Sequence, residues 1–158
     1  MKKLEELIST YKDFPKKGIN FKDVLEIIQE PQVFNELIIK MSSSQILKKS
    51  EAIISIDARG FIFGSAIALQ SSKPMIFARK PGKLPGELIT EKYKLEYGEN
   101  SLSIQKEALE EYQTYVIVDD LLFKRSYLDD YVQVLDPANT WFIGVRCSLA
   151  RTRYFRLR

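Results

Sequence analysis

Two short apolar runs constrain the fold most, because each one is followed at once by a charged turn. Residues 52–56 (AIISI) precede Asp57-Ala58-Arg59-Gly60, and an apolar, helix-like stretch, Phe61–Leu69, comes next. Residues 115–118 (YVIV) precede Asp119-Asp120. A strand, a tight turn and a helix in this order are typical of α/β proteins, whose parallel strands lie buried between helices. The sequence therefore predicts an α/β fold with a parallel sheet flanked by helices.

Local patterns predict further elements on either side of this unit. In residues 1–12, apolar side chains recur at helical spacing, which predicts an amphipathic helix. Residues 13–23 contain proline and glycine and are expected to form no regular element. A second helix is expected to begin at Pro31, because proline suits the first turn of a helix. Residues 74–78 are expected to form the strand that follows the helix-like stretch.

Composition excludes several classes of protein. A length of 158 residues suits one domain, and no apolar run approaches the roughly 20 residues of a membrane span. The single cysteine, Cys147, and the absence of histidine exclude an internal disulfide, a zinc site and a histidine base. The net charge of +3 is too small to indicate a nucleic-acid binder. We therefore expect a cytoplasmic protein that binds small molecules and neither nucleic acid nor membrane.

Two turns carry residues suited to a phosphorylated sugar. Asp119 and Asp120 follow an apolar strand, at the end of an open sheet where α/β proteins bind ligands. Such carboxylates accept hydrogen bonds from sugar hydroxyls or hold magnesium through water, although an acidic pair also commonly caps a helix. Arg59 lies in a strand-to-helix turn, where helix N–H groups and a guanidinium suit a phosphate. An exposed arginine beside packing glycines is the alternative.

A basic loop precedes a predicted hairpin. Arg79, Lys80 and Lys83 lie within five residues on a loop that contains glycine and proline, a composition that suits a pyrophosphate clamp. Residues 87–104 alternate in polarity and are expected to form two strands that turn at Gly98-Glu99-Asn100. A carboxylate on this hairpin would serve as an acid or a base. Solvated basic loops are common, but the hairpin behind this one favours a lid.

Five segments in this order and spacing resemble adenine phosphoribosyltransferase, a type I phosphoribosyltransferase. They are DFPKKGINFKD, DARGFIFG, RKPGKLPGE, YKLEYG and VIVDDLL, and the resemblance covers residues 4–122. It implies an enzyme that joins adenine to 5-phosphoribosyl-1-pyrophosphate and releases AMP and pyrophosphate. It also implies an N-terminal hood over about residues 1–30, a hairpin lid and a homodimer. Magnesium would arrive bound to the donor, with no direct protein ligand.

The resemblance assigns a role to particular residues of this chain. Phe21 would stack on adenine, and backbone groups near Asn20 and Lys22 would read the edge of the base. Glu96 matches the acid that exchanges a proton with the purine N7, and Tyr97 would close over the site. The remaining residues would bind the donor: Arg59, Lys80 and Lys83 its pyrophosphate, and Asp119 and Asp120 its ribose. Arg79 joins this set through its place in the basic loop alone.

The resemblance ends after Leu122. The family continues with Ala-Thr-Gly-Gly-Thr, whose backbone N–H groups cradle a phosphate, whereas this chain has residues 123–127 (FKRSY). Without glycine the left-handed backbone of such a cradle is disfavoured. Up to Leu122 there are 15 lysines and two arginines, and from Phe123 onward one lysine and six arginines. We hypothesise that 1–122 is the phosphoribosyltransferase-like part and that 123–158 is a divergent segment, replaced or frameshifted, of the same domain.

Three interpretations of function follow. The leading one is a purine salvage transferase by descent, whose activity is expected to be impaired by the missing phosphate loop. A second is a non-catalytic purine- or nucleotide-binding module derived from the family. A third is another type I phosphoribosyltransferase, such as one for xanthine, although the hood segment FPKKGINFKD and the acid segment LEYG argue against it. Within the tail, Val132, Val134 and residues 141–145 are expected to form a strand or two.

Overall fold

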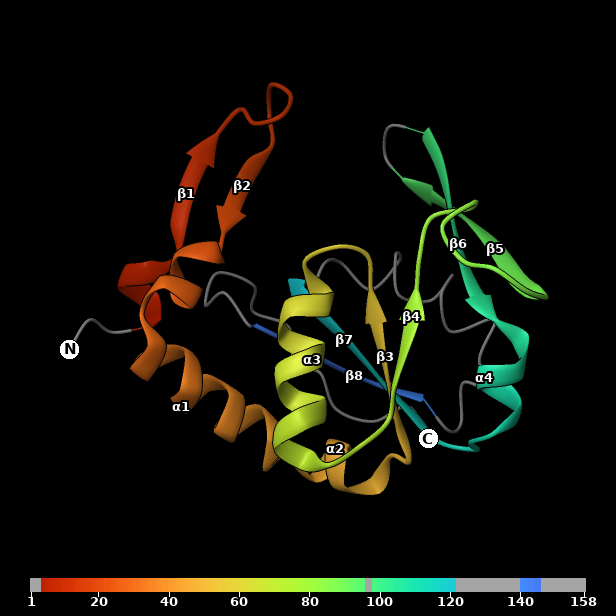
Figure 1. Cartoon of the computed structure of the whole chain (residues 1–158). Helices are drawn as coiled ribbons and strands as arrows, with labels where there is room; N and C mark the ends of the chain where they lie inside the picture. Colours follow the sequence, from red (N-terminus) through yellow and green to blue (C-terminus); the bar gives the residue numbers. More distant parts are fainter. Residues whose placement is uncertain (1–3, 96–97, 122–139, 146–158) are drawn as a thin grey trace.

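A computed structural model describes residues 4–95, 98–121 and 140–145 of the chain. Within these ranges the centre of the fold is a four-stranded parallel sheet with the strand order β4-β3-β7-β8 (Figure 1). Its strands are β3 (Ala52–Ile56), β4 (Met75–Ala78), β7 (Tyr115–Leu121) and β8 (Thr140–Val145). The predicted parallel sheet is confirmed, as are the strands expected at 52–56, 74–78 and 141–145. Val132 and Val134 lie outside the described residues.

Helices cover one face of the sheet. They are α1 (Pro31–Ser42), α2 (Gln45–Lys49) and α3 (Gly60–Ser71), and α1 and α3 lie side by side in front of the strands (Figure 1). The core on this face is formed by fully buried side chains such as Phe63, Ile67 and Val116. Every residue of β3 is buried, which explains its nearly continuous apolar sequence. Pro31 begins α1 as expected.

The opposite face is covered by a hairpin. β5 (Leu88–Leu95) pairs antiparallel with β6 (Gly98–Gln105), and α4 (Lys106–Glu110) follows. Leu102 and Ile104 of β6 pack with Ile54 and Ile117 of the sheet in a second core. The predicted turn at Gly98-Glu99-Asn100 is wrong, because these residues pair with residues 93–95 in the β5–β6 ladder. Alternation of polarity located the hairpin but not its turn, since both strands continue beyond their alternating parts.

The N-terminal segment differs from the sequence prediction. After η1 (Leu4–Leu7), β1 (Ser9–Lys12) pairs antiparallel with β2 (Asn20–Asp23), and η2 (Leu25–Gln29) follows. The predicted helix over 1–12 and the irregular segment over 13–23 are therefore both wrong in part. Hydrogen bonding to a strand eight residues further on overrides the helical spacing, which is a weak local preference. Asp13 and Gly18, both with positive φ, form the turn between the strands.

The two hairpins rise on either side of the carboxyl ends of β3 and β4 (Figure 1). We call residues 4–30, with the β1–β2 hairpin, the hood, and the loop 79–86 with the β5–β6 hairpin the lid. Within the lid, the backbones of Arg79, directly after β4, and Ser103 of β6 exchange two hydrogen bonds, of 2.9 and 2.7 Å. No helix within the described residues is both long and apolar enough to cross a membrane.

Candidate functional site

The site is built where β3 and β7 end side by side. Asp57-Ala58-Arg59-Gly60 forms the turn from β3 into α3, and its Asp57–Ala58 peptide bond is cis. Gly60 brings this turn against β7, since a Cβ atom at this position would lie 2.8 Å from the Val118 carbonyl oxygen. The same Cβ would lie 3.1 Å from Asp119 Oδ1. Glycine is therefore required here to place the turn directly beside the two aspartates.

Arg59 and Asp120 form an ion pair at this edge of the sheet. Arg59 Nε lies 2.9 Å from Asp120 Oδ2, and the exposed fractions of the two side chains are 29% and 4%. The pairing of β7 with β8 is irregular between Asp119 and Leu121, which places Asp120 at the shift in register. Such irregularities turn a side chain away from its regular direction and are frequent beside functional sites. The sequence predicted both residues as ligand contacts, and the fold brings them together.

Asp119 differs electrostatically from its neighbour. Burial raises the pKa of Asp119 to about 7, and repulsion by the adjacent Asp120 carboxylate adds to this rise. The backbone N–H of Asp120 donates to Asp119 Oδ1 at 2.8 Å, which, like the charge of Arg59, opposes the rise in pKa. The two carboxylates therefore differ in their surroundings: Asp120 pairs with Arg59, and burial raises the pKa of Asp119.

The hood brings Phe21 to the same place. Phe21, on β2, has the Arg59 guanidinium over its ring, with 5.0 Å from Arg59 Cζ to the ring centroid. Phe14 packs edge-on against the ring, with centroids 5.3 Å apart. On either side of Phe21, Asn20 is exposed and Lys22 is half-buried, with the Lys22 ammonium donating to the Thr10 hydroxyl. The purine contacts and the donor contacts predicted from the sequence therefore meet at Arg59.

The side chain of Arg79 binds to Asp57, in the turn after β3. Its Nε donates to Asp57 Oδ2 at 3.1 Å, and its Nη1 donates to the Lys83 carbonyl oxygen at 3.2 Å. The guanidinium also lies 5.8 Å from the ring centroid of Phe61. Sequence reasoning missed Asp57, although it stands at the carboxyl end of β3, where ligand contacts of an open sheet concentrate. In this conformation Arg79 fixes the basic loop to the sheet.

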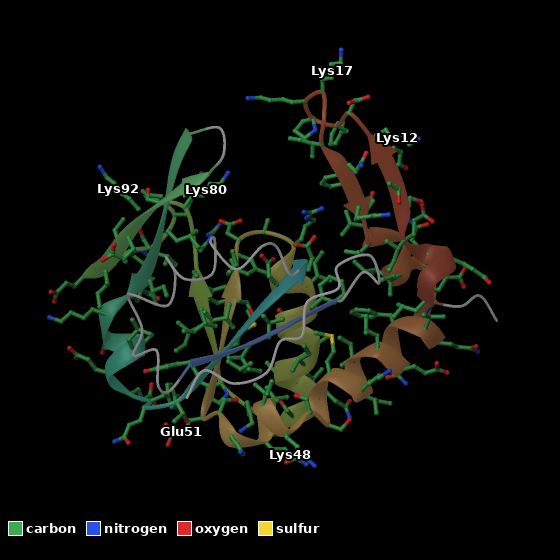
Figure 2. The ribbon with its side chains drawn as sticks, turned by 180° about the vertical axis from the view of Figure 1, so that it is seen from behind. Lys12, Lys17, Lys48, Glu51, Lys80 and Lys92 are labelled. Atoms are coloured by element: carbon green, nitrogen blue, oxygen red, sulfur yellow. The ribbon has the colours of Figure 1, made fainter. Side chains whose placement is uncertain are left out.

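The lysines of the basic loop are exposed. Lys80 and Lys83 both lie at the surface, and Figure 2 shows Lys80 and Lys92 on the lid. Lys12 and Lys17 lie on the hood, on the other side of the sheet edge. Glu96 and Tyr97, and the segment 123–127 that replaces the phosphate loop, lie outside the described residues.

The residues present fit magnesium that arrives with a ligand. Among the described residues, no group of three or more histidine, cysteine, aspartate or glutamate side chains is placed to hold a metal ion. Asp119 and Asp120 supply the hard oxygen atoms that Mg²⁺ prefers, and two carboxylates with ligand phosphates and water form a usual magnesium site.

Comparisons with known proteins identify the family. No protein-family model matches the chain. Two adenine phosphoribosyltransferases of Prochlorococcus marinus are similar in sequence. That of strain AS9601 is 75% identical over 122 residues, or 77% of this chain and 72% of the relative. That of strain MIT 9312 is 58% identical over 145 residues, or 92% of this chain and 85% of the relative.

Two crystal structures are similar in fold. The adenine phosphoribosyltransferase of Thermoanaerobacter pseudethanolicus matches with a TM-score of 0.79 and 35% identity, over 89% of this chain and 84% of that one. The yeast enzyme, complexed with an imino-altritol bisphosphate and adenine, matches with a TM-score of 0.71 and 28% identity, over 89% and 85%. The chain therefore belongs to the adenine phosphoribosyltransferase family and has the type I phosphoribosyltransferase fold.

Proposed function

We propose that the protein is a purine salvage transferase that forms AMP and pyrophosphate from adenine and 5-phosphoribosyl-1-pyrophosphate. The observation that carries this proposal is the meeting of Phe21, Arg59 and Asp120 at one edge of the sheet. An aromatic face, a guanidinium and a carboxylate are the groups that a base, a pyrophosphate and a ribose require. Family membership and the adenine bound by the yeast enzyme support the same assignment.

We assign the purine side of the site to the hood. Adenine stacks on Phe21, a contact worth on the order of 1–3 kcal/mol. Backbone groups near Asn20 and Lys22 read the edge of the base, and Tyr97 closes over it. Glu96 exchanges a proton with N7, which makes adenine a better nucleophile or leaving group.

We assign the donor side to the sheet edge and the lid. Arg59, Lys80 and Lys83 neutralise the leaving pyrophosphate, and Arg79 contributes by holding the basic loop in place. Asp119 and Asp120 accept hydrogen bonds from the ribose hydroxyls. Magnesium carried by the donor supplies additional positive charge to the leaving group.

The segment after Leu122 is expected to lower the rate of this reaction. Lys124, Arg125 and Ser126 offer charge and a hydroxyl, but residues 123–127 lack the glycines of a phosphate cradle. Losing several charge-assisted hydrogen bonds of about 1.5–3 kcal/mol each would strongly weaken donor binding. We therefore expect impaired turnover.

We keep residues 1–122 as the phosphoribosyltransferase-like part and 123–158 as a divergent segment of the same domain. Pairing of β8 with β7 supports a common domain. Sequencing the encoding DNA tests the origin of the segment: a frameshift requires that another reading frame downstream encode the missing Ala-Thr-Gly-Gly-Thr loop.

We also propose a cytoplasmic homodimer. Ile62 and Leu69 on α3 and Phe77 on β4 are large apolar side chains with exposed fractions of 37%, 85% and 43%. A second copy of the chain is the occupant we assign to these exposed side chains. Light scattering of the purified protein should give twice the chain mass, and Leu69→Glu should give the monomer; a monomeric wild-type protein would reject the dimer.

One assay separates the candidate functions. Purified protein is incubated with adenine, the phosphoribosyl donor and Mg²⁺, and AMP is measured. AMP formation supports the transferase, and its rate shows whether residues 123–127 replace the glycine loop. Binding of adenine without AMP would favour the non-catalytic module, and turnover of xanthine in place of adenine would favour another phosphoribosyltransferase.

A further inference from the structure

One arginine contacts two side chains to which the proposed function assigns different parts of the substrates. Arg59 lies over the ring of Phe21, at 5.0 Å from Cζ to the centroid, and its Nε lies 2.9 Å from Asp120 Oδ2. In the proposed function, Phe21 is the stacking surface for adenine and Asp120 is a ribose ligand. The Arg59 side chain therefore contacts both groups at once.

We propose that Arg59 couples the two substrate sites: it blocks the adenine-stacking face of Phe21 until pyrophosphate draws its guanidinium away. The inference rests on the proposed function. A guanidinium over an aromatic ring occupies the surface on which a base would stack, so the two compete for it. Phe14 already contacts the same ring, which leaves less of it for adenine.

Pyrophosphate can replace Asp120 as the anionic partner of Arg59. Asp120 Oδ2 is buried and close to Arg59 Nε, but it accepts no aligned hydrogen bond from any described residue. Pyrophosphate carries more negative charge than a carboxylate and accepts two parallel hydrogen bonds from arginine. Moving Arg59 to pyrophosphate would uncover the Phe21 ring and free the Asp120 carboxylate together.

Coupling of this kind changes a measurable affinity. Adenine binds only the fraction of molecules in which Phe21 is uncovered, so its apparent dissociation constant is raised by the inverse of that fraction. A cation–π contact corresponds to a factor of about 2 to about 30 in this population. We therefore expect adenine to bind between about 2-fold and about 30-fold more tightly once pyrophosphate is bound.

The first experiment uses the wild-type chain. Calorimetric titration with adenine is carried out without and with saturating magnesium pyrophosphate, with no phosphoribosyl donor present. Tighter adenine binding with pyrophosphate supports the coupling. Equal adenine affinity in the two titrations overturns it and leaves the proposed function standing. If adenine binds in neither titration, the proposed function and the coupling both fail.

The second experiment tests whether Arg59 is responsible. Arg59→Ala should bind adenine without pyrophosphate as tightly as the wild type does with it, and pyrophosphate should change this affinity no further. A residue that only supported the fold would instead weaken adenine binding when removed. Arg59→Lys keeps the charge but loses the planar face and should show reduced coupling. Lys17→Gln removes a positive charge from the tip of the hood and should keep the wild-type coupling. If Lys17→Gln also abolished the coupling, the effect would come from the total positive charge of the protein, and the role proposed for Arg59 would be overturned.

Discussion

Asp57 and Arg79 form a hydrogen-bonded ion pair, 3.1 Å from Oδ2 to Nε, that joins the turn after β3 to the start of the basic loop. The arginine continues the connection, because its Nη1 donates to the Lys83 carbonyl oxygen and its backbone pairs with Ser103 of the lid. The Asp57 carboxylate thereby holds Arg79, the residue that bonds both to the basic loop and to the hairpin of the lid.

Asp57→Asn should loosen the lid and leave the sheet intact. The amide keeps the size of the side chain but loses the charge, and because Arg79 is one-third exposed we expect a stability loss of only about 1 kcal/mol. Turnover kinetics should show a higher KM for the donor and an unchanged adenine affinity. Glu87→Gln, which breaks the exposed Lys106–Glu87 pair, is the control and should change neither. An unaltered donor KM in Asp57→Asn would contradict the positioning role.

Gly60→Ala should destabilise the protein by about 1–3 kcal/mol in urea unfolding, because its methyl group would meet the Val118 carbonyl oxygen at 2.8 Å. Gly64→Ala should be worse, since its methyl group would lie 1.7 Å from Ser55 Oγ in the buried strand β3. Ser65→Ala, on the exposed side of the same helix, should stay within about 0.5 kcal/mol of the wild type. Wild-type stability in Gly60→Ala would show that α3 and β7 have room to separate.

Asp119 should make stability depend on pH. Its pKa is about 7 in the folded protein, against 3.8 for an unperturbed carboxyl group. Between these values the unfolded chain has released this proton and the folded chain still holds it, so stability falls as pH rises. The slope is at most about 1.4 kcal/mol per pH unit.

Asp119→Asn tests this directly. Urea unfolding across the same pH range should show that the substituted protein gains stability relative to the wild type as pH rises from about 4 to about 7. Glu107→Gln removes an exposed carboxylate of α4 and should keep the wild-type slope. A parallel pH dependence in the wild type and Asp119→Asn would mean that this proton is not retained on folding.

Glu96→Gln tests the acid assigned by the family resemblance. If AMP forms, the substitution should lower kcat by a factor of about 10² to 10⁴, the usual contribution of a general acid or base. Adenine affinity should change little, because the stacking surface of Phe21 is retained. Glu91→Gln, an exposed acid on β5, should keep wild-type turnover. Undiminished kcat in Glu96→Gln would remove the acid from the mechanism.

Much of the central fold could be predicted from local sequence. Ala52–Ile56 is buried on both faces, and such a strand needs apolar residues throughout. The strand can therefore be recognised from its own residues alone. Pro31 begins α1 for an equally local reason, its fixed backbone angle. Arg59 and Asp120 were likewise singled out from the sequence, because the ends of buried strands carry characteristic residue types, whereas Phe21 was singled out only by the resemblance to the family.

Other features depend on partners that are distant in sequence. Ser9–Lys12 has helical spacing but is a strand, because it pairs with Asn20–Asp23. The ion pair of Asp57 with Arg79 joins residues 22 apart, and no local pattern marks it.

The sequence by itself determined the α/β order, the buried strands and the family motifs, since propensity, turn chemistry and burial act over a few residues. Only the tertiary structure decided that Arg59 lies between Phe21 and Asp120 and that the pKa of Asp119 is raised. Both result from packing that brings three separate segments to one edge of the sheet, where burial and charge act through space.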